Sequence, residues 1–336
     1  MEQWRETMAY QQERTVAVEA VLAASQLCRT VQANLVAGTA LTKGDKSPVT
    51  VADFGAQAVV SHLLAGAFPN DPLVGEEDAD ALRQSDNAIT LGKVLAAVEA
   101  VLPGLDEAAV LGAIDRGTYP GGSKGRHWTL DPIDGTKGFL RLDQYAVALG
   151  LIENGEVVLG VLGCPNLPHD ASQPDGGKGC LFVAVKGEGA FVRTLDDSVE
   201  TCIGVTQIAE ASRARFCESV ESAHTSQSDS GRIASLLGIQ EPPFRIDSQC
   251  KYAAVARGDA SIYLRLPTRK DYVEKIWDHA GGYAIITEAG GRVTDVTGAP
   301  LDFSLGRGLA NNKGVVVTNG LLHDPVVSAV RSVLDV

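Results

Sequence analysis

The sequence predicts a mixed α/β protein in two parts: an α+β part over residues 1–200 and a smaller α/β part over residues 201–336. Two patterns support this division. Long helical patterns followed by paired strands fill the first part, whereas short strands alternate with helices in the second. A chain of 336 residues also exceeds what one ordinary small core needs, so one large domain or two joined domains are expected.

The first part begins with helices, identified by apolar residues at helical spacing. They are expected over 10–36, 51–68, 89–102 and 106–114. The second follows an extended segment around Pro48, and Pro103-Gly104 separates the last two. Between them, LVGEE at 73–77 predicts a short strand that runs into acidic residues.

Strands follow. A Gly-rich stretch leads into a strand before Asp131. Residues 145–165 predict a hairpin around Asn154-Gly155, and residues 180–194 a second one around Gly187. In the second part, strands are expected over 215–220, 244–246, 260–266, 292–296 and 314–319, and helices over 226–238, 249–257, 277–290 and 323–334. The sequence contains no internal repeat and no low-complexity tract.

Composition limits the partners. The formal net charge of −13 disfavours polymeric nucleic acid, because such a partner requires a basic surface. No apolar run reaches the roughly 18 residues of a membrane span, so no membrane partner is expected. The N-terminal residues lack the pattern of a signal peptide. We expect a cytoplasmic protein, or a chloroplast or mitochondrial one if a transit peptide precedes this sequence.

Six cysteines without a C-x-x-C pair disfavour zinc ligation and a disulfide framework. Cys164 and Cys180 bracket a loop rich in Pro, Gly and Asp, and they could meet if their flanking segments pair as strands. A redox-sensitive link between them and two reduced thiols are both open, and the reduced state is favoured.

The most informative stretch is WTLDPIDGTKGF, residues 128–139. Asp131 and Asp134 lie three apart on a turn permitted by Pro132 and Gly135, and Thr136 follows. Two carboxylates at a strand end form a hard-oxygen site suited to magnesium, and N–H groups at the next helix start could bind phosphate. The stretch therefore indicates metal-assisted phosphate ester hydrolysis. For a D-x-x-D motif alone, a solvated acidic turn would be the better interpretation.

Other acidic residues occupy similar positions. Asp53 lies early in its helix, Glu76 and Glu77 end a short strand, and Asp278 lies at a helix start. Each has a simple local explanation as a helix-dipole contact, a solvated group or a cap. Together they place carboxylates at several strand–helix junctions, where α/β folds gather ligand groups.

These motifs resemble the inositol monophosphatase superfamily of lithium-sensitive magnesium phosphatases. Its D-P-[apolar]-D-G-T signature is met by residues 131–136, its W-D signature by Trp277-Asp278, and its G-E-E element by residues 75–77. The segments KSPVTVADFGAQAVV, GCPNLP, IDSQCKY, IYLRLP and EKIWDHAGG resemble the plant and fungal 3'(2'),5'-bisphosphate nucleotidase branch. The resemblance implies the layered αβαβα sandwich of the sugar phosphatases.

The resemblance also implies a metal site. Glu76, Asp131 and the Ile133 carbonyl would hold one Mg²⁺, and Asp131, Asp134 and Asp278 a second, with a third, weaker ion near Glu76. Inhibition by Li⁺ is expected.

The same resemblance assigns the reacting groups. Asp53 and Thr136 would activate water, since a hydroxyl needs a carboxylate to receive its proton. The N–H groups of Gly135 and Thr136 would hold the scissile phosphate.

The nucleotide and its second phosphate would bind to His224, Ser248, Lys251 and Arg265. Lys251 and Arg265 could instead be surface charges. Tyr272 and Lys275 are weaker candidates for the same pocket. Leu142, Ser222 and Gln227 depart from the family pattern, which puts the turn after residue 141 and the shape of the nucleotide pocket in question.

The implied reaction is hydrolysis of adenosine 3',5'-bisphosphate, or its sulfated relative 3'-phosphoadenosine 5'-phosphosulfate, to the 5'-nucleotide and phosphate. The expected partner is a small-molecule nucleotide, and monomer and homodimer are both open. Two alternatives remain: an inositol polyphosphate 1-phosphatase and a nucleotide sensor without catalysis. A haloacid-dehalogenase-type phosphatase is disfavoured, because its nucleophile belongs to a D-x-D arrangement.

Overall fold

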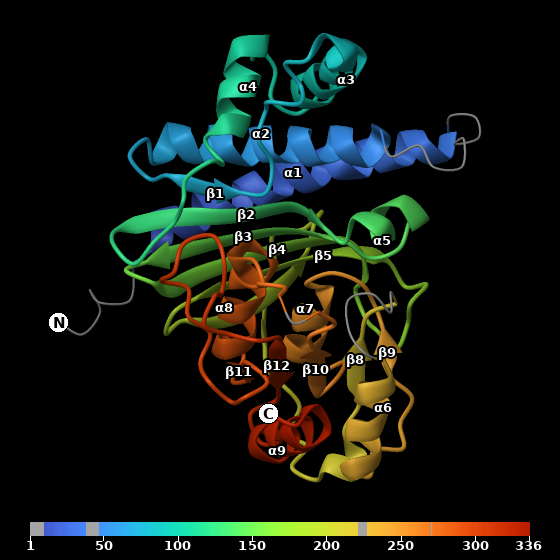
Figure 1. Cartoon of the computed structure of the whole chain (residues 1–336). Helices are drawn as coiled ribbons and strands as arrows, with labels where there is room; N and C mark the ends of the chain where they lie inside the picture. The colour runs from blue at the N-terminus through green and yellow to red at the C-terminus, as the bar shows by residue number, and fades with distance from the viewer. Residues whose placement is uncertain (1–9, 38–46, 221–226, 270) are drawn as a thin grey trace, which may run out of the picture.

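The computed structural model describes residues 10–37, 47–220, 227–269 and 271–336. The described chain forms five layers: helices, a large sheet, helices, a smaller sheet and helices (Figure 1). The predicted αβαβα sandwich is therefore confirmed.

The helices are α1 Gln11–Ala37, α2 Ser47–Ala67, α3 Ala88–Glu99, α4 Glu107–Asp115, α5 Thr136–Arg141, α6 Gln227–Leu236, α7 Cys250–Arg257, α8 Ala280–Glu288 and α9 His323–Leu334, with short 3₁₀ turns η1 Ser85–Asn87, η2 Ala211–Arg213 and η3 Ile276–Asp278. The strands are β1 Leu73–Gly75, β2 Arg126–Asp134, β3 Ala146–Glu153, β4 Glu156–Pro168, β5 Lys178–Val185, β6 Gly189–Thr194, β7 Thr201–Ile203, β8 Phe216–Glu218, β9 Phe244–Arg245, β10 Ile262–Arg265, β11 Arg292–Thr294 and β12 Val315–Thr318.

The first sheet has seven strands in the order β1-β2-β3-β4-β5-β6-β7. Only β1 is parallel to its neighbour, and the others form an antiparallel meander. The β3–β4 turn has Asn154 and Gly155 at φ 52° and 83°, as the Asn-Gly signal predicts for a tight hairpin. The second sheet has five strands in the order β11-β12-β10-β8-β9.

Both faces of the first sheet are covered, so its strands are apolar at nearly every position. In β5, Leu181 and Val183 belong to the core beneath α1 and α2, whereas Phe182 and Ala184 belong to the core shared with α7 and α8. A third core lies between the second sheet and helices α6 and α9. The two outer gaps between layers thus have a cluster each, and one cluster fills both gaps beside α7 and α8.

Glycines let α8 approach the first sheet closely. A Cβ atom on Gly160 would lie 2.4 Å from the Gly281 carbonyl oxygen, and one on Gly150 would lie 2.9 Å from the Ala280 Cβ. No side chain could stand between these backbones. This contact brings the start of α8, and with it Asp278, against the sheet that carries the other predicted ligands.

Two expectations about helix starts are wrong. The segment 47–50, expected to be extended, is the first turn of α2, because proline near a helix start fits the helical backbone and loses no required hydrogen bond. The helix expected over 277–290 is split into η3 and α8 at His279, whose φ of −134° is not helical. Asp53 therefore lies in the second turn of its helix.

The two-part division near residue 200 stays a prediction; β7 belongs to the first sheet and β8 begins the second. Among the described residues, the helical stretch Val49–Ala67 is long and apolar enough to cross a membrane, but 72% of it is buried inside the fold, as in a core helix. Leu142, which ends α5, is exposed and has a left-handed φ of 64°.

Candidate active site

Parallel pairing of β1 with β2 brings two predicted ligands side by side. Gly75 pairs with Leu130, and the Glu76 N–H donates to the Leu130 carbonyl at 3.2 Å. Glu76, which follows β1, and Asp131, which is still within β2, therefore lie side by side at one end of the sheet. The neighbouring Gln57 side chain, fully buried in α2, fixes this strand end by bonding the backbone N–H and carbonyl of Glu77 at 3.1 and 2.6 Å.

The DPIDGT turn breaks the β2–β3 register between Asp131 and Asp134. Gly135 has a φ of 94°, a left-handed conformation that favours glycine, and a Cβ there would lie 2.9 Å from the Ser248 Cβ. The Asp134 Oδ2 accepts a hydrogen bond from the Gln249 N–H at 2.5 Å. The turn is thereby tied to the start of α7, which carries the predicted substrate residues.

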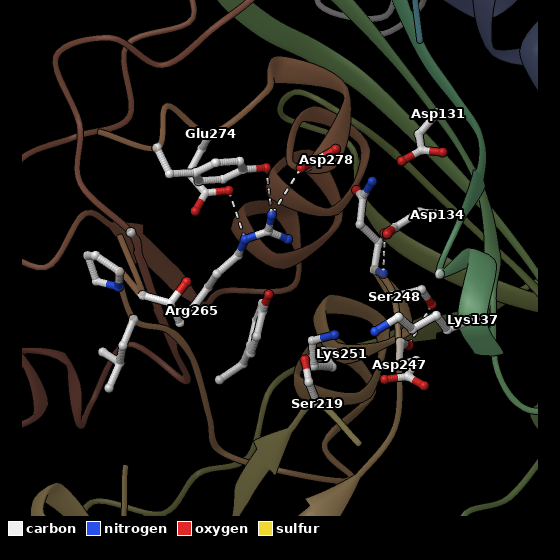
Figure 2. A pocket seen from close by; sticks show the side chains of 18 of the residues that line it. Asp131, Asp134, Lys137, Ser219, Asp247, Ser248, Lys251, Arg265, Glu274 and Asp278 are labelled. Atoms are coloured by element: carbon white, nitrogen blue, oxygen red, sulfur yellow. Dashed lines mark hydrogen bonds and ion pairs between the residues drawn. The ribbon is translucent and has the colours of Figure 1, made fainter. Parts of the chain in front are cut away.

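Asp278 comes from η3 and faces Arg265 of β10. The Arg265 Nη2 donates to the Asp278 Oδ2 at 3.1 Å, and its Nε donates to the Glu274 Oε2 at 2.7 Å (Figure 2). The Gln249 side chain holds this region by bonding the Trp277 carbonyl at 2.8 Å and the Gly282 N–H at 3.0 Å. Gln249 therefore joins the turn that contains Asp134, its own segment before α7, and the segment that contains Asp278.

These groups line one cavity of about 1110 Å³. Its wall includes most predicted site residues: Glu76, Asp131, Ile133, Asp134, Gly135, Thr136, Ser248, Lys251, Arg265, Asp278 and Tyr272. Figure 2 shows Asp131 and Asp134 across the cavity from Arg265 and Lys251, with Glu274 and Asp278 beside Arg265.

Some predicted residues lie elsewhere. Asp53 is buried behind Asp131, outside the cavity wall, and no hydrogen bond joins it to Thr136 in the described chain. Their joint role stays a prediction. Lys275 lies over the Trp277 ring at 5.8 Å rather than in the wall. His224, Ser222 and the Gln227 side chain lie outside the described residues.

Cys164 and Cys180 are paired opposite each other in β4 and β5 and are buried free thiols outside the cavity wall. Burial raises the pKa of the Cys180 thiol to about 11, which disfavours the reactive thiolate. A redox link between the two stays a prediction.

Crowding raises the proton affinity of the carboxylates. Burial, followed by the charges of Glu76, Asp134 and Asp278, raises the pKa of Asp131 well above its usual value. Desolvation and the charge of Asp278 raise the pKa of Glu76 to about 7, although part of this residue is exposed at the cavity wall. Burial and the charges of Glu77 and Glu76 raise the pKa of Asp53. The cluster thus lacks compensating positive charge at its centre.

The donor set fits a hard divalent cation. The Asp131 Oδ1 is buried without a hydrogen-bond partner in the described structure, an arrangement that normally costs about 1–3 kcal/mol or more. The surrounding donors are carboxylate oxygens and the Ile133 carbonyl, which magnesium prefers. A cation bound there would satisfy the orphaned oxygen and relieve the mutual repulsion of the carboxylates.

The opposite wall is cationic. Lys251 is 4% exposed, and desolvation lowers its pKa although the charge of Asp134 acts in the other direction. Ser248 has a φ of 67° and hydrogen-bonds the Asp247 carbonyl through its hydroxyl at 2.5 Å. Asp247 in turn pairs with Arg141 of α5. The buried Lys251 and the partly buried Arg265 can compensate the charge of an anionic ligand.

Arg307, outside the cavity wall, supports the segments that carry Glu76 and Asp278. Its guanidinium donates to the carbonyls of Gly75, Gly117 and Tyr119 at 2.6, 2.9 and 3.2 Å and lies 4.7 Å from the centre of the Trp277 ring. Gly75, just before Glu76, and Trp277, just before Asp278, are therefore both held by Arg307.

Sequence reasoning missed Gln57, Gln249, Glu274 and Arg307. The available signal was the position of Gln57, Gln249 and Glu274 inside the motif segments KSPVTVADFGAQAVV, IDSQCKY and EKIWDHAGG. Arg307 lies outside these segments, and a lone arginine has no distinctive spacing.

Comparison with known proteins is consistent with this geometry. A relative from Schizosaccharomyces pombe named 3'(2'),5'-bisphosphate nucleotidase is 46% identical, with 97% of each chain covered. One from Arabidopsis thaliana named 3'(2'),5'-bisphosphate nucleotidase 1 is 48% identical over 96% of this chain and 97% of its own.

The fold is shared with solved structures of lower identity. An inositol monophosphatase from Anabaena superposes with a TM-score of 0.62 at 20% identity, covering 97% of both chains. Residues 9–334 match the inositol monophosphatase family. The chain therefore belongs to the inositol monophosphatase family.

Proposed function

We propose that the protein is a metal-dependent phosphatase that removes the 3'-phosphate of adenosine 3',5'-bisphosphate and of 3'-phosphoadenosine 5'-phosphosulfate. One observation supports this above all: carboxylates from β2, from η3 and from the residue after β1 share a cavity with the buried Lys251 and the partly buried Arg265. The names of the most similar relatives support the same substrate class.

Glu76, Asp131, Asp134, Asp278 and the Ile133 carbonyl would hold Mg²⁺, in two or three ions. When bound, the metal supplies positive charge that activates water and stabilises the leaving oxygen. Inhibition by Li⁺ belongs to the same proposal.

The chain's own groups handle the proton and the phosphates. Asp53 accepts the proton of the attacking water by way of the Thr136 hydroxyl, and its raised pKa makes it a stronger base than an ordinary carboxylate. The backbone at Gly135 and Thr136 orients the scissile phosphate. Lys251, Arg265 and Ser248 bind the phosphate that is not cleaved.

The test is a phosphate-release panel with adenosine 3',5'-bisphosphate, its sulfated relative and inositol 1,4-bisphosphate, each with Mg²⁺, with Mg²⁺ and Li⁺, and with chelator. We expect the nucleotides to be hydrolysed with the highest kcat/KM, and chelator and Li⁺ to suppress the reaction. Preference for the inositol substrate would favour the inositol polyphosphate 1-phosphatase alternative. Undiminished release after removal of all divalent metal would overturn the proposal.

A further inference from the structure

We propose that Glu274 is a positioning residue: supported by His279 and Tyr252, it holds Arg265 so that the site selects substrates carrying a second phosphate. The inference rests on the proposed function, because it concerns how the same cavity recognises the phosphate that is not cleaved.

A chain of buried polar contacts leads to Arg265. The Tyr252 hydroxyl lies 2.8 Å from the His279 Nδ1, and the His279 Nε2 lies 3.2 Å from the Glu274 Oε2. The same Glu274 oxygen accepts from the Arg265 Nε at 2.7 Å. His279, Tyr252 and Glu274 are 0%, 1% and 4% exposed, so water does not compete for these bonds.

The contacts are mutually consistent. The two ring nitrogens of His279 each bond one neighbour, the Tyr252 hydroxyl and the Glu274 carboxylate. Burial opposes ionisation of Glu274, but the hydrogen bond from His279 and the charge of Arg265 dominate and lower its pKa to about 2. Glu274 therefore remains a carboxylate and keeps its charge-assisted bond to the guanidinium.

This arrangement orients the guanidinium. Glu274 occupies its Nε, and Asp278 and Tyr272 occupy its Nη2 at 3.1 and 3.4 Å. The Nη1 has no partner among the described residues, and Figure 2 shows the unbonded nitrogen on the side of the cavity that carries Asp134 and Lys251. Its N–H groups are thus available to an anion placed between Arg265 and Lys251.

A further metal ion between Glu274, Asp278 and His279 is not needed to explain this cluster. Ligand atoms of Glu274, Asp278 and His279 lie within 4.8 Å of one another, a spacing that could suit a cation. The guanidinium of Arg265 already contacts both carboxylates, and it supplies the positive charge there. The cluster is therefore explained by the arginine that it orients.

The proposal predicts a substrate-dependent defect. The Glu274→Gln variant keeps the shape of the side chain but loses the charge that fixes the Arg265 Nε. We expect its KM for adenosine 3',5'-bisphosphate to rise about tenfold, since one charge-assisted hydrogen bond is weakened. For adenosine 3'-monophosphate, which lacks the second phosphate, kcat/KM should stay within about twofold of wild type.

A matched control is available in the second part of the chain. Arg257 and Asp259 form a half-buried ion pair, with Nη2 and Oδ2 2.5 Å apart, outside the cavity wall. Asp259→Asn should leave the ratio of the two substrates unchanged. Tyr252→Phe removes only the distal hydroxyl and should shift the same ratio in the same direction, by about two- to threefold.

The outcomes separate the two proposals. Failure of the wild-type protein to hydrolyse adenosine 3',5'-bisphosphate would overturn the proposed function. An active wild type whose Glu274→Gln variant loses both substrates equally, or neither, would overturn the positioning role alone. If Glu274→Gln does not fold, as judged by thermal melting, Tyr252→Phe decides, and an unchanged substrate ratio in that variant overturns the inference.

Discussion

Replacing Arg307 by methionine tests whether its contacts to Gly75 and Trp277, the residues before Glu76 and Asp278, maintain the site. Methionine keeps much of the apolar stem and removes the guanidinium. Three carbonyls lose a donor, but the Gly117 oxygen keeps its second bond, from the Gly75 N–H at 2.8 Å. The carbonyls of Gly75 and Tyr119 therefore bear most of the loss.

The magnitude follows from these contacts. Leaving a buried acceptor unpaired costs about 1–3 kcal/mol, and a lost cation–π contact about 0.5–2 kcal/mol. Part of this loss is offset, because the variant no longer has to bury a charged group. The cost of that burial in the wild type is visible in the pKa of Arg307, which desolvation lowers. We expect the free energy of unfolding to fall by about 3 kcal/mol.

Urea unfolding of the metal-free protein measures this loss. In activity assays, the variant should need a higher Mg²⁺ concentration for half-maximal rate, because the chain before Glu76 and before Asp278 loses its common tie. Arg292→Met is the control: that arginine is 53% exposed and pairs with an 86% exposed Asp324, so removing it should change stability by less than about 1 kcal/mol. A loss below about 1 kcal/mol in Arg307→Met, with a wild-type Mg²⁺ requirement, would refute the reasoning.

Three other perturbations test separate parts of the structure. Asp53→Asn should lower kcat at least about a hundredfold while nucleotide affinity, measured by calorimetry, is kept; wild-type turnover would exclude Asp53 as the base. Leu142→Gly should raise the free energy of unfolding in urea by about 0.5–1 kcal/mol, because the left-handed φ of 64° strains leucine; a decrease would contradict this. Burial, with the charge of Arg292, lowers the pKa of His323 to about 4. Since the unfolded chain takes up that proton near pH 6.5, stability should fall as the pH drops from about 6.5 to about 4. His323→Gln should flatten this dependence in urea titrations, and an unchanged slope would exclude His323 as its source.

The position of the acidic turn, which carries two of the proposed metal ligands, was predictable because its signal is local. Asp131 and Asp134 stand next to Pro132 and Gly135, and the turn that these residues require leaves the carboxylates at a strand end. The turn signals at Asn154-Gly155 and around Gly187 likewise identified both hairpins, and Asn154-Gly155 adopts the left-handed conformation that its composition favours.

The supporting residues were not predictable, because their role depends on packing between distant segments. Arg307 contacts carbonyls of residues 75, 117 and 119, and Gln249 bonds residues 134, 277 and 282. Nothing near Arg307 distinguishes it from a surface arginine, and the motif around Gln249 does not say which segments its side chain joins. The start of α2 was misplaced for a simpler reason: Pro48 was taken as a break, whereas it occupies a helical first turn.

The glycine-lined contact between α8 and the first sheet also bears on biosynthesis. Residues 10–203 can emerge from the ribosome and pair as the seven-stranded sheet, but the face containing Gly150 and Gly160 stays bare until residues 280–288 follow. That bare face carries Ala148, Leu162 and Phe182, which are all buried in the complete fold. We therefore expect chains that end before α8 to aggregate through this surface rather than to persist as a soluble half-enzyme, so the segment that delivers Asp278 is also the one that makes the nascent sheet soluble.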